Sequence, residues 1–180
     1  KYVDSVKEIL REFDMVIMQH EIPLDTVWYT VDFCWKNQIP VVLNPAPAAA
    51  VPEDVIDKAA YITPNEHEAA LIFGDGMSTE ELLKQYPEKL IITQGSRGVS
   101  ACLKTGEVIQ VPARPARVVD TTGAGDTLNG ALAVQLAQGK SLKEALIYAN
   151  TAASLSTEKL GAQSGMPSAE EVEKELKKEM

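Results

Sequence analysis

The sequence predicts an α/β fold with a mostly parallel sheet, and two observations support that prediction. Short apolar runs of strand character alternate along the chain with helical segments. Such alternation indicates βαβ units, in which a helix connects two parallel strands. The chain has 180 residues, of which 45% are hydrophobic and 24% charged. This length and composition are those of one soluble domain with a single core.

Four short apolar runs are predicted to form buried strands. They cover residues 15–18, 40–44, 60–63 and 90–93. Helices are expected after the first three strands, over residues 25–37, 52–59 and 66–73. The fourth run ends at Gly95, and a helical pattern also opens the chain directly after Lys1. The chain therefore reads as a part of a longer protein.

The alternation of strands and helices is interrupted after the fourth strand. Two β-rich runs within residues 99–112 flank Thr105-Gly106, which predicts an antiparallel hairpin. A further strand is expected over residues 116–119, followed by a glycine-rich turn and a helix over residues 126–138. The last helix is predicted over residues 169–180, as a charged amphipathic outer layer.

Reciprocal caps mark several helix starts. A Ser followed three residues later by Glu satisfies two backbone donors at once. The pattern occurs at Ser78/Glu81, Ser141/Glu144 and Ser168/Glu171. Gly139 is expected to end the helix before Ser141.

Charge and cysteine usage exclude several classes of protein. The formal net charge is -9 and the Lys and Arg residues are dispersed, so no basic face for nucleic acid is predicted. No apolar run is long enough for a membrane helix, and no signal peptide is apparent. Cys34 and Cys102 fit two buried reduced thiols of a cytoplasmic protein. His20 and His67 lack metal-ligand spacing and are expected to be structural or surface residues.

The most informative segment is Val-Asp-Thr-Thr-Gly-Ala-Gly-Asp-Thr at residues 119–127, between a predicted strand and a helix. Small residues at 123–125 allow a ligand to approach the backbone where the first N–H groups of the helix lack partners. Those donors and the helix dipole favour a phosphate. Asp126, at the helix entrance, is then placed to take a proton from a substrate hydroxyl, a role worth about 10²–10⁴-fold in rate.

A plainer interpretation remains open, because helix starts favour Asp and glycines serve tight turns in any protein. Two other phosphate motifs are absent. The P-loop pattern does not occur. The next glycine after Gly125 is Gly130, which does not match the dinucleotide-binding pattern.

The string Asp-Thr-Thr-Gly-Ala-Gly-Asp at residues 120–126 resembles the closing motif of the ribokinase-like (PfkB-type) carbohydrate kinases, and the resemblance extends over nearly the whole chain. It implies a three-layer α/β/α fold in which residues 1–180 form the C-terminal nucleotide-binding and catalytic part. The family's N-terminal strands, β lid and most of its sugar contacts would be absent from this chain. The resemblance further implies ATP, Mg²⁺ and K⁺ as cofactors and a homodimer when the protein is full length.

The same resemblance assigns roles to individual residues. Asp126 would be the general base, with the amides of Gly123, Ala124, Gly125 and Asp126 as the anion hole. The nucleotide would contact Asn65, Thr93, Gln94, Gly95, Ser96, Arg97, Gly98, Gly125, Asp126 and Asn150. Glu68 would support Mg²⁺ indirectly and Glu21 would reach the sugar. As alternatives, Asn65 and Glu68 form a plausible capping pair, Gly95 and Gly98 suit a simple turn, and Asn150 suits a solvent-facing helix position.

A monovalent-cation loop is also implied by the resemblance. Its K⁺ ligands, mostly backbone carbonyls, would come from Asp120, Thr122, Ser156, Lys159, Gly161 and Gly165. Gly165 stands where the family commonly has Ser, which puts the last ligand in doubt.

The implied activity is phosphorylation of D-ribose to D-ribose 5-phosphate by ATP, with little or no turnover by this chain alone. Alternatives are another kinase of the family, acting on fructose, deoxyribose or a nucleoside, and a non-catalytic nucleotide-binding regulatory domain. A Rossmann-type oxidoreductase is disfavoured by the glycine spacing.

Overall fold

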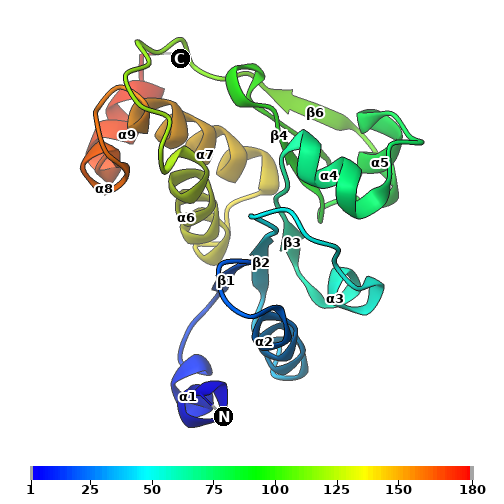
Figure 1. The fold of residues 1–180 in the computed structure, drawn as a ribbon. Helices are drawn as coiled ribbons and strands as arrows, with labels where there is room; N and C mark the ends of the chain where they lie inside the picture. Colours follow the sequence, from blue (N-terminus) through cyan, green and yellow to red (C-terminus); the bar gives the residue numbers. More distant parts are fainter. Residues whose placement is uncertain (1, 179–180) are drawn as a thin grey trace. The chain divides into compact units, whose positions relative to one another are not determined.

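The computed structural model describes residues 2–178, which divide into two compact units. Unit 1 comprises Lys1–Thr93 and Ser100–Val108, and unit 2 comprises Gln94–Val99 and Ile109–Met180. Figure 1 shows the elements of both units in chain order. Within the described range, no helix is both long and apolar enough to cross a lipid bilayer.

Unit 1 contains a parallel sheet with the strand order β1-β2-β3. Its strands are β1 (Val16–Gln19), β2 (Val41–Asn44) and β3 (Tyr61–Ile62). Val16 lies opposite Val41, and Val42 lies opposite Tyr61, both in parallel register. Parallel bridges from Ile62 to Leu90 and from Asn65 to Thr93 continue the pairing to β4 (Ile91–Thr93). The predicted parallel arrangement of the first four strands is confirmed.

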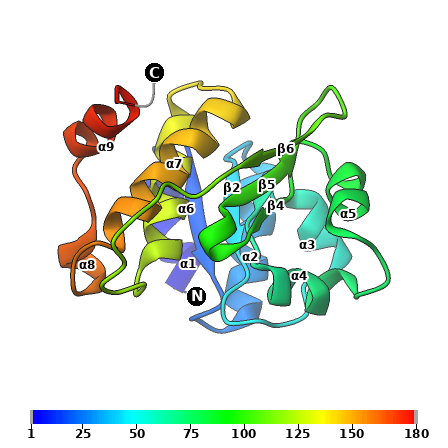
Figure 2. The same cartoon turned by 90° about the horizontal axis from the view of Figure 1, so that it is seen from above.

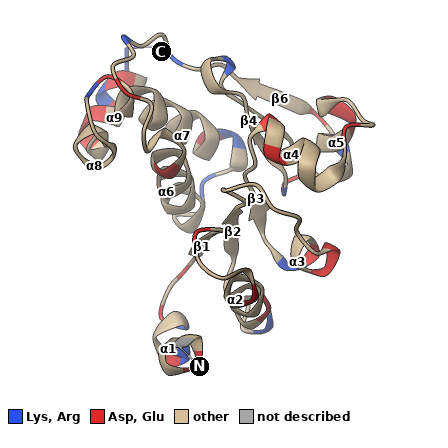
Figure 3. Cartoon of the chain, in the orientation of Figure 1, with Lys and Arg blue, Asp and Glu red and all other residues tan. Residues whose placement is uncertain are grey.

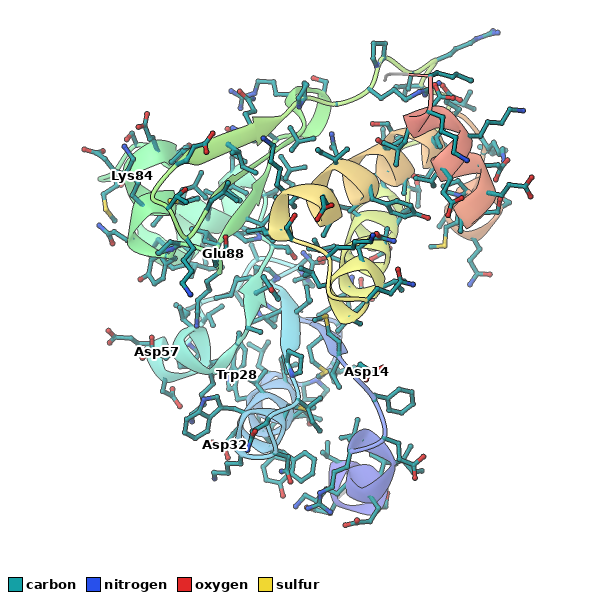
Figure 4. All side chains as sticks on the ribbon, turned by 180° about the vertical axis from the view of Figure 1, so that it is seen from behind. Asp14, Trp28, Asp32, Asp57, Lys84 and Glu88 are labelled. Carbon is teal, nitrogen blue, oxygen red and sulfur yellow. The ribbon has the colours of Figure 1, made fainter. Side chains whose placement is uncertain are left out.

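The helices of unit 1 follow their strands as the periodicity predicts. They are α1 (Tyr2–Leu10), α2 (Leu24–Lys36), α3 (Glu53–Lys58), α4 (Glu66–Phe73) and α5 (Thr79–Gln85). On α2 the spacing of Val27, Val31 and Cys34 places all three on one face, where each is fully buried. Asp32, on the opposite side of that helix, pairs with Lys58 of α3 at 2.9 Å; Figure 4 labels Asp32 on α2.

The predicted burial of the first strand is wrong. All four residues of β2 are buried, whereas none of the β1 residues is, and Ile17 is 41% exposed. Within the described residues β1 is the edge of its sheet, with β2 on one side. An apolar run shows that a strand is extended and half-buried, but it does not distinguish an edge strand from a central one.

The predicted hairpin is confirmed. β4 is followed in its sheet by β5 (Val99–Cys102) and β6 (Val108–Val111), in the order β4-β5-β6. The turn closes where the Leu103 N–H donates to the Glu107 carbonyl at 2.8 Å, and Gly106 has a φ of 85°. That left-handed conformation favours glycine.

The strand predicted over residues 116–119 is wrong, because these residues form a loop. The backbone N–H groups of Val119 and Asp120 both donate to the Thr157 carbonyl, at 2.8 and 3.1 Å. One carbonyl at the end of a helix therefore takes the donors that a neighbouring strand would otherwise have accepted. The β-branched residues of the segment remain exposed, with Val118 at 61%.

Unit 2 consists mainly of helices, namely α6 (Ala124–Ala137), α7 (Leu142–Ser156), α8 (Ala162–Gly165) and α9 (Ala169–Leu176). Figures 1 and 2 show α6 and α7 packed side by side. The two helices bury Leu132 of α6 and Leu146 of α7 completely. α9 packs on α7 and buries Val172 to 2% exposure.

All three predicted Ser/Glu capping boxes are present, at the starts of α5, α7 and α9. Gly139 has a φ of 78°, as expected of a helix stop. The last helix ends at Leu176, and residues 179–180 of the predicted helix lie outside the described residues.

The charged side chains are interleaved, as the sequence indicates. Figure 3 shows Lys and Arg spread over helices and loops of both units, with Asp and Glu nearby. Cys34 and Cys102 are both buried and neither forms a disulfide. Burial raises the pKa of the Cys34 thiol to about 11, which keeps it protonated.

Candidate active site

The start of α6 lacks the side-chain cap that closes four other helices, as does the start of α2 after Pro23. Box-type caps close the N-termini of α4, α5, α7 and α9. α6 instead follows Gly123 and has no side-chain cap. The first N–H groups of a helix have no carbonyl partner within that helix, and its dipole places partial positive charge there. The start of α6 is therefore suited to an anion, as the sequence predicts.

Gly123 is required at this helix start for two reasons. Its φ of 79° lies in the left-handed region that L side chains rarely adopt. A Cβ at this position would also lie 2.9 Å from the Cβ of Ala162 in α8. Gly125 differs, because a Cβ there would meet nothing within 4 Å. The space beside Gly125 is therefore open to a ligand.

Asp126 lies in the first turn of α6 and is exposed. The neighbouring polar residues turn inward instead. The Thr127 hydroxyl donates to the Gly123 carbonyl and the Asn129 amide donates to the Gly125 carbonyl, both at 2.9 Å. Thr127 and Asn129 are 7% and 3% exposed. The turn thus presents its carboxylate to the surface, beside the N–H groups of the helix start.

Asp120 joins the motif to a loop that is distant in sequence. Its carboxylate accepts hydrogen bonds from the N–H groups of Thr122 and Gly161, both at 2.9 Å. Together with a hydrogen bond from the Thr122 side chain, which has the largest effect, these bonds hold the Asp120 pKa below its usual range. The carboxylate therefore fixes the loop that contains Gly161 against the segment that leads into α6.

Backbone carbonyls converge beside Gly165, at the end of α8. A Cβ on Gly165 would lie 2.6 Å from the Ser156 carbonyl oxygen and 3.6 Å from that of Lys159. Both carbonyl oxygens therefore lie close to residue 165. Carbonyl oxygens in such a cradle suit a hard monovalent or divalent cation. The arrangement also favours glycine at residue 165, since any side chain there would need the backbone to move.

The predicted nucleotide turn is a short 3₁₀ helix, η1 (Gly95–Arg97). The Gln94 N–H donates to the Gly98 carbonyl at 2.8 Å and closes the turn. Gly98 has a φ of 91°, and a Cβ on it would lie 2.0 Å from the Val111 carbonyl oxygen. Gly98 thus serves backbone packing, whereas a Cβ on Gly95 would meet nothing within 4 Å. Only Gly95 leaves open space for a ligand.

Asn150 of α7 is buried, with 6% of its surface exposed, so the alternative of a solvent-facing residue is wrong. Its side-chain amide donates to the Pro112 carbonyl at 2.7 Å and to the Val111 carbonyl at 3.4 Å. These are the residues against which Gly98 packs. Asn150 therefore holds the backbone that supports the predicted nucleotide turn.

The remaining predicted residues lie in unit 1, after the carboxyl ends of the parallel strands. Asn65 and Glu68 form the complete capping box of α4, with hydrogen bonds of 2.8 and 2.9 Å. The capping interpretation is thus confirmed. Glu21 is exposed in the turn after β1. Thr93 ends β4 and donates its N–H to the Pro64 carbonyl at 2.9 Å.

A polar chain that sequence reasoning missed lies at the same strand ends. The Gln19 amide donates to the Asn44 side chain at 3.3 Å, and Asn44 donates to the Thr63 carbonyl at 3.1 Å. The sequence feature that indicates these residues is a single polar residue at the end of each apolar run. Such residues on adjacent parallel strands lie at the same edge of the sheet.

His20, which directly follows β1, is 7% exposed. Its Nδ1 lies 3.1 Å from the Pro47 carbonyl oxygen, and its ring meets Trp28 edge to face at 5.3 Å; Figure 4 labels Trp28 on α2. Among the described residues, His20 Nε2 has no hydrogen-bond partner. Burial lowers the His20 pKa, which keeps the ring neutral.

Unit 2 thus brings most of the predicted residues into two groups. One surrounds the start of α6 and the carbonyl cradle; its members are Asp120, Thr122, Gly123, Ala124, Gly125, Asp126, Ser156, Lys159, Gly161 and Gly165. The other joins the Gln94–Gly98 turn to Asn150 through Val111 and Pro112. Glu21, Asn65, Glu68 and Thr93 belong to unit 1.

Comparison with known proteins identifies close relatives. The chain is 47% identical to the ribokinase of Bacillus subtilis over 97% of its own length, and 45% identical to that of Lactococcus lactis over 98%. It spans 59% and 58% of the length of those two relatives.

A solved structure of Arabidopsis thaliana ribokinase, complexed with ribose and ATP, superimposes with a TM-score of 0.87 at 33% identity. The superposition covers 97% of this chain and 59% of the other. This similarity establishes a ribokinase-like fold. The sequence profile described as the pfkB family carbohydrate kinases matches residues 2–169. The chain therefore belongs to the pfkB family of carbohydrate kinases.

Proposed function

We propose that this chain carries the phosphoryl-transfer site of an ATP-dependent sugar kinase that converts D-ribose to D-ribose 5-phosphate. The observation that supports this most directly is the start of α6, where a helix end without a side-chain cap adjoins the exposed Asp126. The relatives named ribokinase, and the Arabidopsis homologue complexed with ribose and ATP, favour ribose among the sugars.

In this proposal Asp126 removes the proton from the 5-hydroxyl of ribose as that oxygen attacks the γ-phosphorus of ATP. The new O–P bond forms as the bond from the γ-phosphorus to the bridging oxygen of ADP breaks. The N–H groups of Gly123–Asp126 would stabilise the charge on the phosphoryl oxygens during transfer, with that of Ala124 leaving the Thr121 carbonyl to which it donates at 3.2 Å. One donor of this kind lowers the barrier by roughly 3–4 kcal/mol. Most of the rate enhancement comes from positioning and charge stabilisation.

The nucleotide is proposed to lie against the Gln94–Gly98 turn, with Asn150 near the adenine. The open space beside Gly95 supports contact at that residue. The Asn150 amide already donates to two backbone carbonyls, so its contribution would be to hold the turn as well as to border the base. Glu21, exposed after β1, would reach the sugar.

Mg²⁺ would neutralise charge on the ATP phosphates. The Glu68 side chain is 7% exposed and accepts the Asn65 N–H, so it would act on the hydrated ion through water. Within the described residues, no group of three or more His, Cys, Asp or Glu side chains forms a metal cage.

K⁺ would be held beside Gly165 by the carbonyls of Ser156 and Lys159, whose oxygens both lie close to that residue. A bound K⁺ would add positive charge near the anion site. The Asp120 carboxylate, held by Thr122 and Gly161, would position that loop relative to α6.

Because the chain spans 59% of its Bacillus subtilis relative, we expect it to bind nucleotide but to turn over sugar poorly by itself. The test compares the chain with a chimera in which the Bacillus subtilis ribokinase supplies the unmatched part. ATP consumption is measured with ribose, fructose, deoxyribose and a nucleoside. Transfer of phosphate to ribose by the chimera supports a phosphoryl-transfer site in this chain. The donated part would carry most of the sugar contacts, so the choice among acceptors tests this chain's contribution only where it differs from that of the intact Bacillus subtilis enzyme. Nucleotide binding without transfer to any acceptor indicates a regulatory domain.

A further inference from the structure

Arg114, in the loop after β6, connects two elements that are distant in sequence. Its Nη1 lies 2.9 Å from a Glu158 carboxylate oxygen, and its Nε lies 2.8 Å from a Glu175 oxygen. The side chain of Arg114 is 17% exposed, that of Glu158 31% and that of Glu175 15%. Two directional, charge-assisted hydrogen bonds from one planar guanidinium fix the positions of both partners.

Glu158 lies inside the segment that carries the carbonyl cradle. Ser156 and Lys159, whose carbonyl oxygens lie close to Gly165, are two positions before it and one after it. Thr157, the residue before Glu158, accepts the N–H groups of Val119 and Asp120. A displacement of Glu158 would therefore move both the cradle and the segment that leads to the anion site.

α9 is also held by contacts that do not involve Arg114. Val172 is buried, and the Ser168/Glu171 capping box holds the helix start. Lys178 pairs with the same Glu175 carboxylate at 2.7 Å, so a positive charge remains there when Arg114 is replaced. The second link from α9 to the loop, between Lys159 and Glu171, is half-exposed on both sides and contributes little. Arg114 thus holds the Glu158 side chain, while the Glu158 backbone N–H donates to the Leu155 carbonyl at 3.1 Å.

We propose that Arg114 is a positioning residue that sets the affinity of the Ser156–Gly165 loop for a monovalent cation, acting through Glu158. This inference rests on the cation site of the proposed function. Arg114 contacts Glu158 and Glu175, so it would act on the cradle carbonyls indirectly. Its effect is to restrict the loop to the arrangement in which the Ser156 and Lys159 carbonyls converge. Replacing a residue that supports metal ligands in this way typically lowers the affinity for the metal by about 10–100-fold.

The experiment measures the melting temperature of the protein against K⁺ concentration, with choline chloride keeping the ionic strength constant. Binding to the folded state raises the melting temperature by mass action, so the curve gives the half-saturating K⁺ concentration without any turnover. Arg114→Gln is expected to raise that concentration about tenfold. Lys178→Gln, which removes an exposed partner of Glu175 and leaves Glu158 in place, is expected to leave it unchanged.

Glu158→Gln provides a second variant, since it keeps the Arg114–Glu175 contact, and it should shift the half-saturating concentration in the same direction. If wild type responds to K⁺ and neither Arg114→Gln nor Glu158→Gln shifts the half-saturating concentration, the positioning role is refuted while the cation site stands. An equal shift in Lys178→Gln would also overturn it, because the effect would then be a general one of charge. A wild type with no response specific to K⁺ refutes the cation site and this inference together.

Discussion

The Asp120 carboxylate accepts the backbone N–H of Gly161 at 2.9 Å, across 41 residues of sequence. It also accepts the N–H of Thr122, in the motif that leads into α6. One carboxylate thereby fixes the candidate cation loop relative to the candidate anion site. Both N–H groups donate to a negative charge, so the strength of this connection depends on the ionisation of Asp120.

Replacing Asp120 with Asn should lower the melting temperature at neutral pH, because the amide keeps the shape of the side chain but loses the charge. The folded pKa of Asp120 is lowered, so its stabilising contribution is present above its unfolded value of about 3.9 and is lost as pH falls below it. The gap between wild type and variant should therefore narrow on acidification. Melting curves from neutral to acidic pH measure this, and a constant gap would contradict it.

Three glycines of the α6 region should respond differently to replacement by Ala. Gly123→Ala should destabilise the fold by more than about 1 kcal/mol, because φ is 79° and Ala162 is in the way. Gly130→Ala, inside the helix with no atom near its Cβ position, should stabilise by about 0.5–1 kcal/mol.

Gly125→Ala should leave folding intact, because its Cβ position is open, but should weaken ATP binding by filling the space beside the helix start. Denaturant unfolding gives the stability of each variant, and the rise in melting temperature with ATP gives the binding. An unaltered ATP response in Gly125→Ala would argue against a phosphate at this position.

His20 should make folding stability depend on pH near neutrality. Burial lowers the folded pKa of the ring, so below about pH 6.5 the unfolded chain binds more protons than the folded one. The free energy of unfolding should then fall as pH drops through this range. His20→Leu should remove that pH dependence. It also removes the buried Nε2, which destabilises the folded wild type by about 1–3 kcal/mol because it has no hydrogen-bond partner among the described residues.

His67 provides the matched control, since the chain has 2 histidines and His67 is exposed. The His67→Asn variant should lose stability below about pH 6.5 just as wild type does. Urea unfolding at a series of pH values measures both variants. Persistence of the slope in His20→Leu would show that another group causes it.

The sequence predicts features that depend on neighbouring residues and fails where distant contacts decide. The capping boxes and the Thr105-Gly106 hairpin are local, and all are present. The strand predicted over residues 116–119 was wrong, because Thr157, far along the chain, takes the N–H groups of Val119 and Asp120. The exposure of β1 likewise depends on which strands lie beside it.

The candidate site follows the same rule. The start of α6 with Gly123 and Asp126 was predicted from one continuous string of residues. The need for glycine at residue 165 arises from the Ser156 carbonyl, and no local pattern indicates that contact. The burial of Asn150 depends on the loop after β6. The link from Arg114 to Glu158 and Glu175 joins three separate segments.

The most direct test of the central claim is the rate of ribose phosphorylation by the chimera with Asp126 or with Asp126→Asn. Loss of the general base should reduce the rate by about 10²–10⁴-fold. The rise in melting temperature with ATP should persist, because the N–H groups of the α6 start remain. A variant that keeps the wild-type rate would contradict the assignment of Asp126 as the base.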